Sequence, residues 1–306
     1  MFSVIVPLYN KERFITRAIQ SVLNQNFQDF EIIVINDGST DNSLSVASTI
    51  SDERLRIFTQ ENQGVSAARN KGAEMANYPY LAFLDGDDTW DKNFLSEIKK
   101  LIENFPDAGL YGSNNLFIYP NGSVDKNNVG DIFNGNEEGI IGNYFQIFAD
   151  LQRSPFSNSN LCIPKNIYKK FGGYKVNVKL TEDSDLWCRI ALEYPIAFTT
   201  KPLATYYLAQ EGSTHGIFES RPFEVAIMLD QAVKEGKVKA DQKESVLKLI
   251  ALQKLGLIKR GILTKNKSKI INNFFDGSIV KYYPKEYIKA VAALLMPYSL
   301  FNRLKR

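Results

Sequence analysis

The chain contains few of the residues from which zinc and redox sites are usually built. Its 306 residues include 2 cysteines and 1 histidine. Cys162 and Cys188 lie in separate segments without a Cys-x-x-Cys spacing, so the sequence supports neither a zinc site nor a disulfide framework. No Gly-x-Gly-x-x-Gly follows a predicted strand, which argues against a dehydrogenase that binds a dinucleotide.

Long hydrophobic runs and a strong charge of one sign are also missing. No segment reaches the roughly 18 to 20 uninterrupted apolar residues that span a bilayer. The first residues enter a strand directly, without the basic and apolar regions of a secretory signal. The net charge of +3 is too small to indicate nucleic acid as a partner. We therefore expect a cytoplasmic protein that does not bind nucleic acid.

What the chain does have is an ordinary globular composition, with 44% hydrophobic and 23% charged residues. Its first 115 residues or so alternate short apolar segments with amphipathic ones. We predict strands at 3–7, 31–36, 55–59 and 80–84, with helices at 14–25, 41–51 and 65–75. This alternation is typical of an α/β fold with a mostly parallel sheet flanked by helices.

The remainder of the chain divides into a second α/β stretch and a helical end. We predict a strand pair in 108–119, an extended loop at 121–138, strands at 159–164 and 196–208, and helices at 165–171 and 182–193. After Pro222 the pattern is helical and increasingly basic. We therefore expect one domain at 1–220 and a C-terminal helical region at 221–306.

The segment 287–306 combines apolar residues with a cationic end. Such a helix is suited to peripheral contact with the anionic cytoplasmic face of a membrane. Packing against its own domain or a partner subunit is the alternative, because apolar helix faces are commonly buried in that way.

Three carboxylates, Asp85, Asp87 and Asp88, follow the apolar run at 80–84 within four positions. The carboxyl ends of strands are where open α/β sheets bind ligands. Carboxylates with this spacing suit Mg²⁺ or Mn²⁺ that is also bound to phosphate oxygens. The alternative is a solvated turn in which Asp88 or Thr89 caps the next helix.

Other predicted strand and helix ends carry residues suited to nucleotide binding. Tyr9 follows the first strand, where an aromatic ring could stack on a base, and Asp37 ends the second, where a carboxylate could accept a base N–H. Gly64 allows close backbone approach at a helix start, and Arg69 could face a phosphate. In isolation, Tyr9 also fits a packed aromatic and Arg69 an exposed helical arginine.

Together, the segments 3–10, 34–41, 64–72 and 83–88 resemble the family-2 glycosyltransferases of the GT-A fold, which is Rossmann-like. The resemblance covers about residues 1–215. It implies an inverting, metal-dependent enzyme of polysaccharide biosynthesis. Such an enzyme moves a sugar from a nucleotide-diphosphate donor, most often a UDP-sugar, to a hydroxyl of a glycan or lipid-linked acceptor.

The resemblance also implies roles for individual residues on the donor side. Pro7 and Tyr9 would bracket the base, and Asp37 would accept a hydrogen bond from it. Asp85 would approach the ribose and the metal region, and Arg69 would assist near the diphosphate. Asp87 would ligate the divalent ion, Mn²⁺ or Mg²⁺, which neutralises the departing diphosphate.

On the acceptor side, the segment 181–189 resembles the family's Glu-Asp-x-Asp-Leu-Trp motif at a helix start. The resemblance makes Asp183 the general base that deprotonates the acceptor hydroxyl. Asp185 lies two residues on and cannot share that helical face, so it is either structural or an acceptor contact. Without the resemblance, this motif would indicate only acidic capping of a helix.

One departure from the family pattern concerns histidine. The family often has a histidine in a loop shortly after the strand matching residues 205–207, where this chain has Tyr207 followed by 208–214. His215, the single histidine, is therefore the candidate for a metal or diphosphate contact through a shifted register; an exposed loop position is the alternative.

Two other functions compete with transfer of a sugar. A nucleotidyltransferase would need a glycine-containing loop after the first strand, and residues 9–13 contain no glycine. A catalytically inactive module that binds nucleotide or glycan would not need a base at the acceptor side. The presence of both Asp87 and Asp183 therefore favours an active enzyme.

Overall fold

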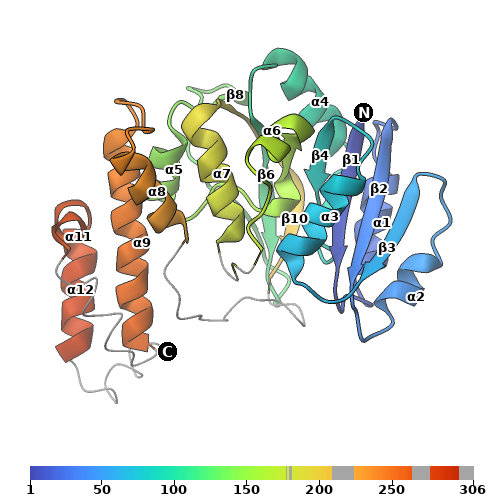
Figure 1. Ribbon diagram of the computed structural model, residues 1–306, viewed down its shortest axis with the longest axis horizontal. Helices are drawn as coiled ribbons and strands as arrows, with labels where there is room; N and C mark the ends of the chain where they lie inside the picture. The colour runs from blue at the N-terminus through green and yellow to red at the C-terminus, as the bar shows by residue number, and fades with distance from the viewer. Residues whose placement is uncertain (177, 179–180, 209–223, 264–275, 296–306) are drawn as a thin grey trace. The chain divides into compact units, whose positions relative to one another are not determined.

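The computed structural model describes residues 1–176, 178, 181–208, 224–263 and 276–295 (Figure 1). The chain divides into two compact units. The first comprises Met1–Tyr144 and Ser154–Gly216, and the second comprises Phe145–Arg153 and Ile217–Arg306. The domain boundary predicted at residue 220 lies outside the described residues and stays a prediction.

Four parallel strands form the N-terminal half of the sheet in the first unit. They are β1 (Phe2–Leu8), β2 (Phe30–Asp37), β3 (Leu55–Gln60) and β4 (Tyr80–Phe83), in the order β3-β2-β1-β4. All four were predicted, and each boundary agrees to within one residue. Strands β1 and β2 are buried along their whole length, which explains why their sequences are mainly apolar.

The other half of the sheet is mixed. Strand β9 (Leu161–Pro164) lies antiparallel between β4 and β6 (Leu110–Ile118), and β10 (Ile196–Tyr207) runs parallel to β6. The short strands β5 (Thr89–Trp90) and β8 (Glu138–Ile140) pair with β10, and β7 (Val124–Lys126) pairs with β6. The α/β fold with a mixed sheet flanked by helices is thus confirmed.

Two local predictions in this half are wrong. Residues 108–119 contain one strand, β6, rather than a pair. Its antiparallel neighbour β7 lies inside the stretch that the sequence predicts as a loop. The reason is a tight turn at Gly122, which has φ 81° and whose N–H donates to the carbonyl oxygen of Tyr119. A strand of three exposed residues has no apolar alternation by which it can be recognised.

Helices cover both faces of the sheet. On one face, α1 (Ile15–Leu23) and α4 (Phe94–Asn104) share a core with Phe2, Val4 and Val6 of β1. On the other face, α3 (Val65–Met75) packs against β1 and β2. A Cβ atom at Gly72 of α3 would lie 2.4 Å from Cγ2 of Ile5, so this close approach requires glycine.

The remaining helices of the first unit are short or lie near the site. They are α2 (Ser43–Ser48), the 3-10 turn η1 (Asn158–Asn160), α6 (Lys165–Lys170) and α7 (Glu182–Glu193). Trp187 of α7 and Tyr174 before it are buried in the core. Helix α5 (Tyr144–Leu151), except for its first residue, lies in the segment Phe145–Arg153 of the second unit.

The described residues from 224 onward form helices and contain no strand, as predicted for the C-terminal region. Helix α9 (Lys243–Leu263) packs against α8 (Glu224–Lys234), α11 (Gly277–Tyr282) and α12 (Pro284–Leu295). Asp276 caps α11 and pairs with Lys254 of α9 at 2.6 Å. Across the described residues, no helix is both long and apolar enough to cross a membrane.

Candidate active site

The parallel strands β1, β2 and β4 end at one pocket of the first unit, with a cavity volume of about 590 Å³. That size suits a small-molecule ligand. Every predicted site residue that the structure describes lines this pocket: Pro7, Tyr9, Asp37, Arg69, Asp85, Asp87 and Asp183. The remaining candidate, His215, lies outside the described residues.

Asp37 is held at the end of β2 by the loop before α3. Its Oδ1 accepts hydrogen bonds from Nε2 of Gln60 and the N–H of Gln63, and its Oδ2 accepts one from the N–H of Gly64, all at 2.8–2.9 Å. Gly64 has φ 88°, a conformation that favours glycine. A carboxylate has about four acceptor positions, so one position on Oδ2 remains for a ligand donor.

Tyr9 and its neighbour Asn10 turn the chain at the end of β1. Tyr9 is 45% exposed, unusually high for a large aromatic side chain beside a buried strand. Asn10 has φ 50°, and its side-chain oxygen accepts a hydrogen bond from the N–H of Thr40 at 2.8 Å. The structure therefore presents Tyr9 at the pocket on a well-anchored turn; its role in stacking stays a prediction.

Arg69 is more deeply buried than the sequence alone indicates. Its guanidinium is within 2.6 Å of Asp85 and 3.5 Å of Glu182, and the residue is only 3% exposed. It also lies over the ring of Tyr174 at 5.3 Å. The exposed helical arginine is therefore excluded, and Arg69 links two carboxylates of the pocket wall.

The three acids after β4 have different surroundings. Asp85 and Asp87 are partly exposed at the pocket, whereas Asp88 is buried. Ser159 holds the turn, because its Oγ contacts both the N–H of Asp85 and the carboxylate of Asp88. The hypothesis that Asp88 caps the next helix is wrong, because the residue before α4 is Asn93. The carboxylate of Asp88 instead accepts hydrogen bonds from Oγ of Ser159 and the N–H of Tyr207. Burial, then the charges of Asp85 and Asp87, raise the pKa of Asp88 well above its ordinary value.

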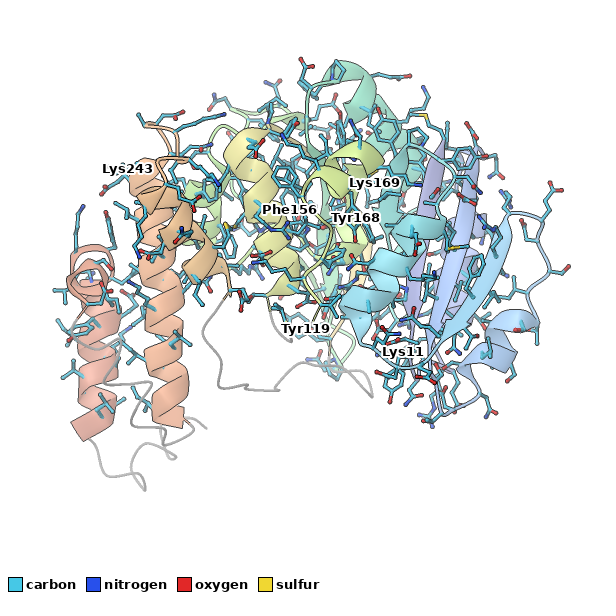
Figure 2. The ribbon with its side chains drawn as sticks, in the orientation of Figure 1. Lys11, Tyr119, Phe156, Tyr168, Lys169 and Lys243 are labelled. Atoms are coloured by element: carbon cyan, nitrogen blue, oxygen red, sulfur yellow. The ribbon has the colours of Figure 1, made fainter. Side chains whose placement is uncertain are left out.

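Lys11 is a pocket residue that the sequence analysis did not select. Its Nζ lies 2.6 Å from Oδ2 of Asp87, and Figure 2 labels it at the edge of the sheet where β1 ends. The backbone of Asp87 is fixed separately, because its carbonyl oxygen accepts from Arg17 at 2.5 Å. The only signal for Lys11 in the sequence is its position directly after the strand-end residues 7–10.

Glu182 and Asp183 begin α7 at the opposite part of the lining. Burial and the neighbouring Asp183 raise the pKa of Glu182 to about 7, although Arg69 acts in the other direction. Burial also raises the pKa of Asp183, which accepts the N–H of Ser184 at 2.5 Å. Thr181, just before this pair, has φ 67°, a strained conformation for a β-branched residue. Glu182 was predicted only as part of the family motif or, without the resemblance, of an acidic helix cap, and its pairing with Arg69 was not predicted.

Asp185 is structural rather than an acceptor contact. Its side chain is fully buried and pairs with Lys175 at 2.9 Å and with Arg189 at 2.8 Å. Arg189 in turn donates to the carbonyl oxygens of Phe171 and Gly173. Asp185 thus anchors the glycine turn at 172–173 to α7.

The rest of the pocket lining has a different chemistry. It combines amide side chains with aromatic rings and carries no charge: Asn115, Phe117, Asn127, Phe156, Asn158 and Tyr206. The three amides are buried and bond to protein partners, whereas aromatic faces offer flat apolar surfaces. This part of the pocket therefore suits an uncharged ligand with some apolar faces.

The carboxylates of the pocket fit a metal ion that is shared with a ligand. Among the described residues, no group of three or more histidine, cysteine, aspartate and glutamate side chains is placed to hold a metal on its own. Asp85 and Asp87 nevertheless both line the pocket. Mg²⁺ is typically held by one or two carboxylates together with substrate phosphates, so this donor set fits an ion that a nucleotide diphosphate helps to hold.

The fold and the pocket define an α/β protein of the GT-A class, and sequence comparison gives its family. The model of glycosyl transferase family 2 matches residues 3–166. An uncharacterized glycosyltransferase of Rickettsia felis is 31% identical over 229 residues, which cover 74% of this chain and 36% of that protein. The chain belongs to glycosyl transferase family 2.

Other similar proteins are longer than the matched region or more distant in sequence. Glycosyltransferase GlyA of Streptococcus pneumoniae is 32% identical over 171 residues, covering 55% of this chain and 21% of GlyA. The matched region spans little more than a third of the Rickettsia relative.

Solved structures confirm the fold. S. aureus TarS 1-349 in complex with UDP-GlcNAc has a TM-score of 0.65 at 17% identity, covering 89% of this chain and 88% of that one. Mannosyltransferase PcManGT from Pyrobaculum calidifontis, in complex with GDP-Man and Mn²⁺, has a TM-score of 0.61 at 17% identity, covering 96% and 86%. Together with the family match, these similarities confirm the GT-A fold expected from the sequence.

Proposed function

We propose that this protein is an inverting glycosyltransferase that uses Mn²⁺ or Mg²⁺ and a nucleotide-diphosphate sugar, preferably a UDP-sugar. Its acceptor is a hydroxyl of a glycan or of a lipid-linked carrier in polysaccharide biosynthesis. One observation carries the proposal: a single pocket brings together the strand-end residues Tyr9 and Asp37, the carboxylates Asp85 and Asp87, and the candidate base Asp183.

The nucleotide part of the donor is assigned to the end of the pocket formed by β1 and β2. Tyr9 supplies an exposed ring for stacking, and Asp37 retains one acceptor position for a base N–H. The complexes of TarS with UDP-GlcNAc and of PcManGT with GDP-Man support a nucleotide-sugar donor for this fold.

The need for a divalent ion follows from the charges of the lining. The described lining residues include five carboxylates and two cations: Asp37, Asp85, Asp87, Glu182 and Asp183 against Lys11 and Arg69. A diphosphate would meet net repulsion there. A bound divalent ion supplies charge neutralisation for the diphosphate that leaves.

Asp183 is the proposed general base. It would accept the proton of the acceptor hydroxyl while that oxygen attacks the anomeric carbon, and the bond between that carbon and the diphosphate oxygen would break on the opposite side. The configuration at the anomeric carbon is thereby inverted. Burial raises the pKa of Asp183, which makes its ionised form a stronger base.

The acceptor is assigned to the uncharged part of the pocket. The rings of Phe117 and Phe156 would contact apolar sugar faces there, and the buried amides of Asn115, Asn127 and Asn158 would form an uncharged wall around them. This chemistry favours a glycan or the sugar portion of a lipid-linked carrier.

The proposal is tested by donor binding and transfer in two variants. Wild-type protein should gain thermal stability from a UDP-sugar only with Mn²⁺ present, because a ligand of the folded state raises its stability. Asp87→Ala should lose this gain. Asp183→Asn should keep it and lose about 10²- to 10⁴-fold in transfer rate, which is the usual contribution of a general base.

Exposed acids outside the pocket provide matched controls. Asp107→Ala and Asp125→Asn make the same chemical changes at exposed positions and should behave as wild type. Unchanged donor binding by Asp87→Ala with Mn²⁺ would refute the metal assignment. If the wild-type protein binds the donor but transfers its sugar to none of the acceptors offered, an inactive binding module would be supported instead.

We also propose peripheral contact between the C-terminal helices and an anionic membrane. On α12, Ile288 is 65% exposed and Leu294 is 36% exposed, and Lys285 and Lys289 lie on the same short helix. Exposed apolar residues beside lysines are typical of interfacial helices. The cytoplasmic location stays a prediction.

A further inference from the structure

Lys11 and Asp87 form an ion pair inside the pocket. Nζ of Lys11 lies 2.6 Å from Oδ2 of Asp87, and the two side chains are 13% and 17% exposed. Both residues line the pocket. The carboxylate that we assign to the metal ion is therefore already neutralised by a cation of the chain itself.

The backbone at Lys11 is fixed, whereas its side chain is long and adjustable. The N–H of Lys11 donates to Oγ of Ser43 at 2.6 Å, and the preceding Asn10 has φ 50°. The aliphatic stem passes over Gly86, where an added Cβ atom would lie 3.7 Å from Cγ of Lys11. An ammonium on such a stem can change partners without any movement of the main chain.

The other cation of the described lining is already committed. Arg69 is 3% exposed and lies between Asp85 and Glu182. Moving it toward a ligand would leave two half-buried carboxylates without their partner, which is strongly unfavourable. Among the described lining residues, Lys11 is thus the cation that is able to respond to a ligand.

A divalent ion held by Asp87 would compete with the ammonium of Lys11 for the same carboxylate. The ammonium would then need another anion. The diphosphate of the donor would offer one, and ammonium groups bind phosphates well as point charges.

We propose that Lys11 is a switching cation. It holds Asp87 in the protein without donor, and it transfers to the diphosphate of the nucleotide sugar when a divalent ion takes Asp87. This inference rests on the proposed function and adds a residue that positions the diphosphate and makes metal and nucleotide binding depend on each other.

Lys11→Met should change the affinities for Mn²⁺ and for UDP in opposite directions. Without the competing ammonium, Mn²⁺ alone should bind the nucleotide-free protein more tightly. UDP in the presence of Mn²⁺ should bind more weakly, by about tenfold, the usual size of one charge-assisted hydrogen bond. Uridine, which has no phosphate, should bind wild type and Lys11→Met equally.

The measurements are Mn²⁺ binding by electron paramagnetic resonance of the free ion, and UDP and uridine binding by calorimetry. Lys11→Arg keeps the charge and should stay within a few-fold of wild type. Lys71→Met removes an exposed lysine outside the pocket and controls for net charge. Thermal unfolding of each variant establishes that the protein is folded.

The outcomes separate the two proposals. If wild type binds no nucleoside diphosphate with Mn²⁺, the proposed function fails. If wild type binds UDP and Lys11→Met binds it equally well, only the role of Lys11 fails. Tighter Mn²⁺ binding with unchanged UDP binding would mean that Lys11 merely blocks Asp87, and this too would overturn the inference.

Discussion

Replacement of Arg69 by methionine is the sharpest test of how the pocket is held together. The substitution keeps a long apolar stem and removes the guanidinium that lies 2.6 Å from Asp85 and 3.5 Å from Glu182. Two carboxylates of the pocket wall then lose the buried cation between them. Breaking a buried ion pair by removing one partner typically costs about 3–5 kcal/mol of stability.

The loss should depend on pH in a defined direction. In the wild type, the raised pKa of Glu182, about 7 against an ordinary 4.5, means that the folded state binds the proton more tightly than the unfolded state. Stability from this group is therefore full below pH 4.5 and is lost as the pH rises toward 7. Because Arg69 lowers the pKa of Glu182, its removal extends this loss to higher pH. The cost of Arg69→Met should thus be larger at pH 8 than at pH 5.

Urea unfolding at pH 5 and pH 8 measures both quantities, since the free energy of unfolding is obtained by linear extrapolation. Arg69→Lys retains a charge and should lose less than Arg69→Met at both pH values. The double variant Arg69→Met with Glu182→Gln should recover part of the loss at pH 8. A cost below about 1 kcal/mol, within the range of an exposed salt bridge, would refute the buried-bridge reasoning.

Two further predictions concern single groups. Glu182→Gln should remove the decline in stability between pH 4.5 and 7. This decline is about 3 kcal/mol at most by the usual conversion of pKa into free energy. Urea midpoints that fall equally in wild type and variant would assign the decline to other groups. Ile288→Glu should reduce flotation with anionic liposomes, and Lys234→Met, which makes the same change of net charge at an exposed position on α8, is the control. Equal binding by wild type and Ile288→Glu would remove α12 from the membrane contact.

The sequence predicted what local patterns determine. The apolar strands of the first four βα repeats, and the acids that follow them, are short-range signals, and Asp37, Asp85 and Asp87 lie at one pocket because parallel strands end at the same edge of a sheet. The pocket position of Asp183 followed only from a family resemblance, since no local pattern relates α7 to β4.

Contacts between distant parts of the chain were not predictable in this way. Lys11 meets Asp87 across 76 residues, and Arg69 meets Glu182 across 113. Such pairings depend on which helices and strands become neighbours, and composition does not specify this. The burial of Asp88 was missed for the same reason, because its partner Ser159 lies 71 residues further along.

The bond from Ser159 also has a consequence for how the protein acquires activity. The acidic turn after β4 is synthesised early, yet it is fixed by a hydroxyl from η1, more than seventy residues later in the chain. Contacts of such long sequence separation slow folding, because the chain between the partners must first close into a loop. A nascent or truncated chain that ends before η1 would carry all three acids without the serine that fixes their turn. The metal binding proposed for Asp87 should therefore require a chain that includes η1.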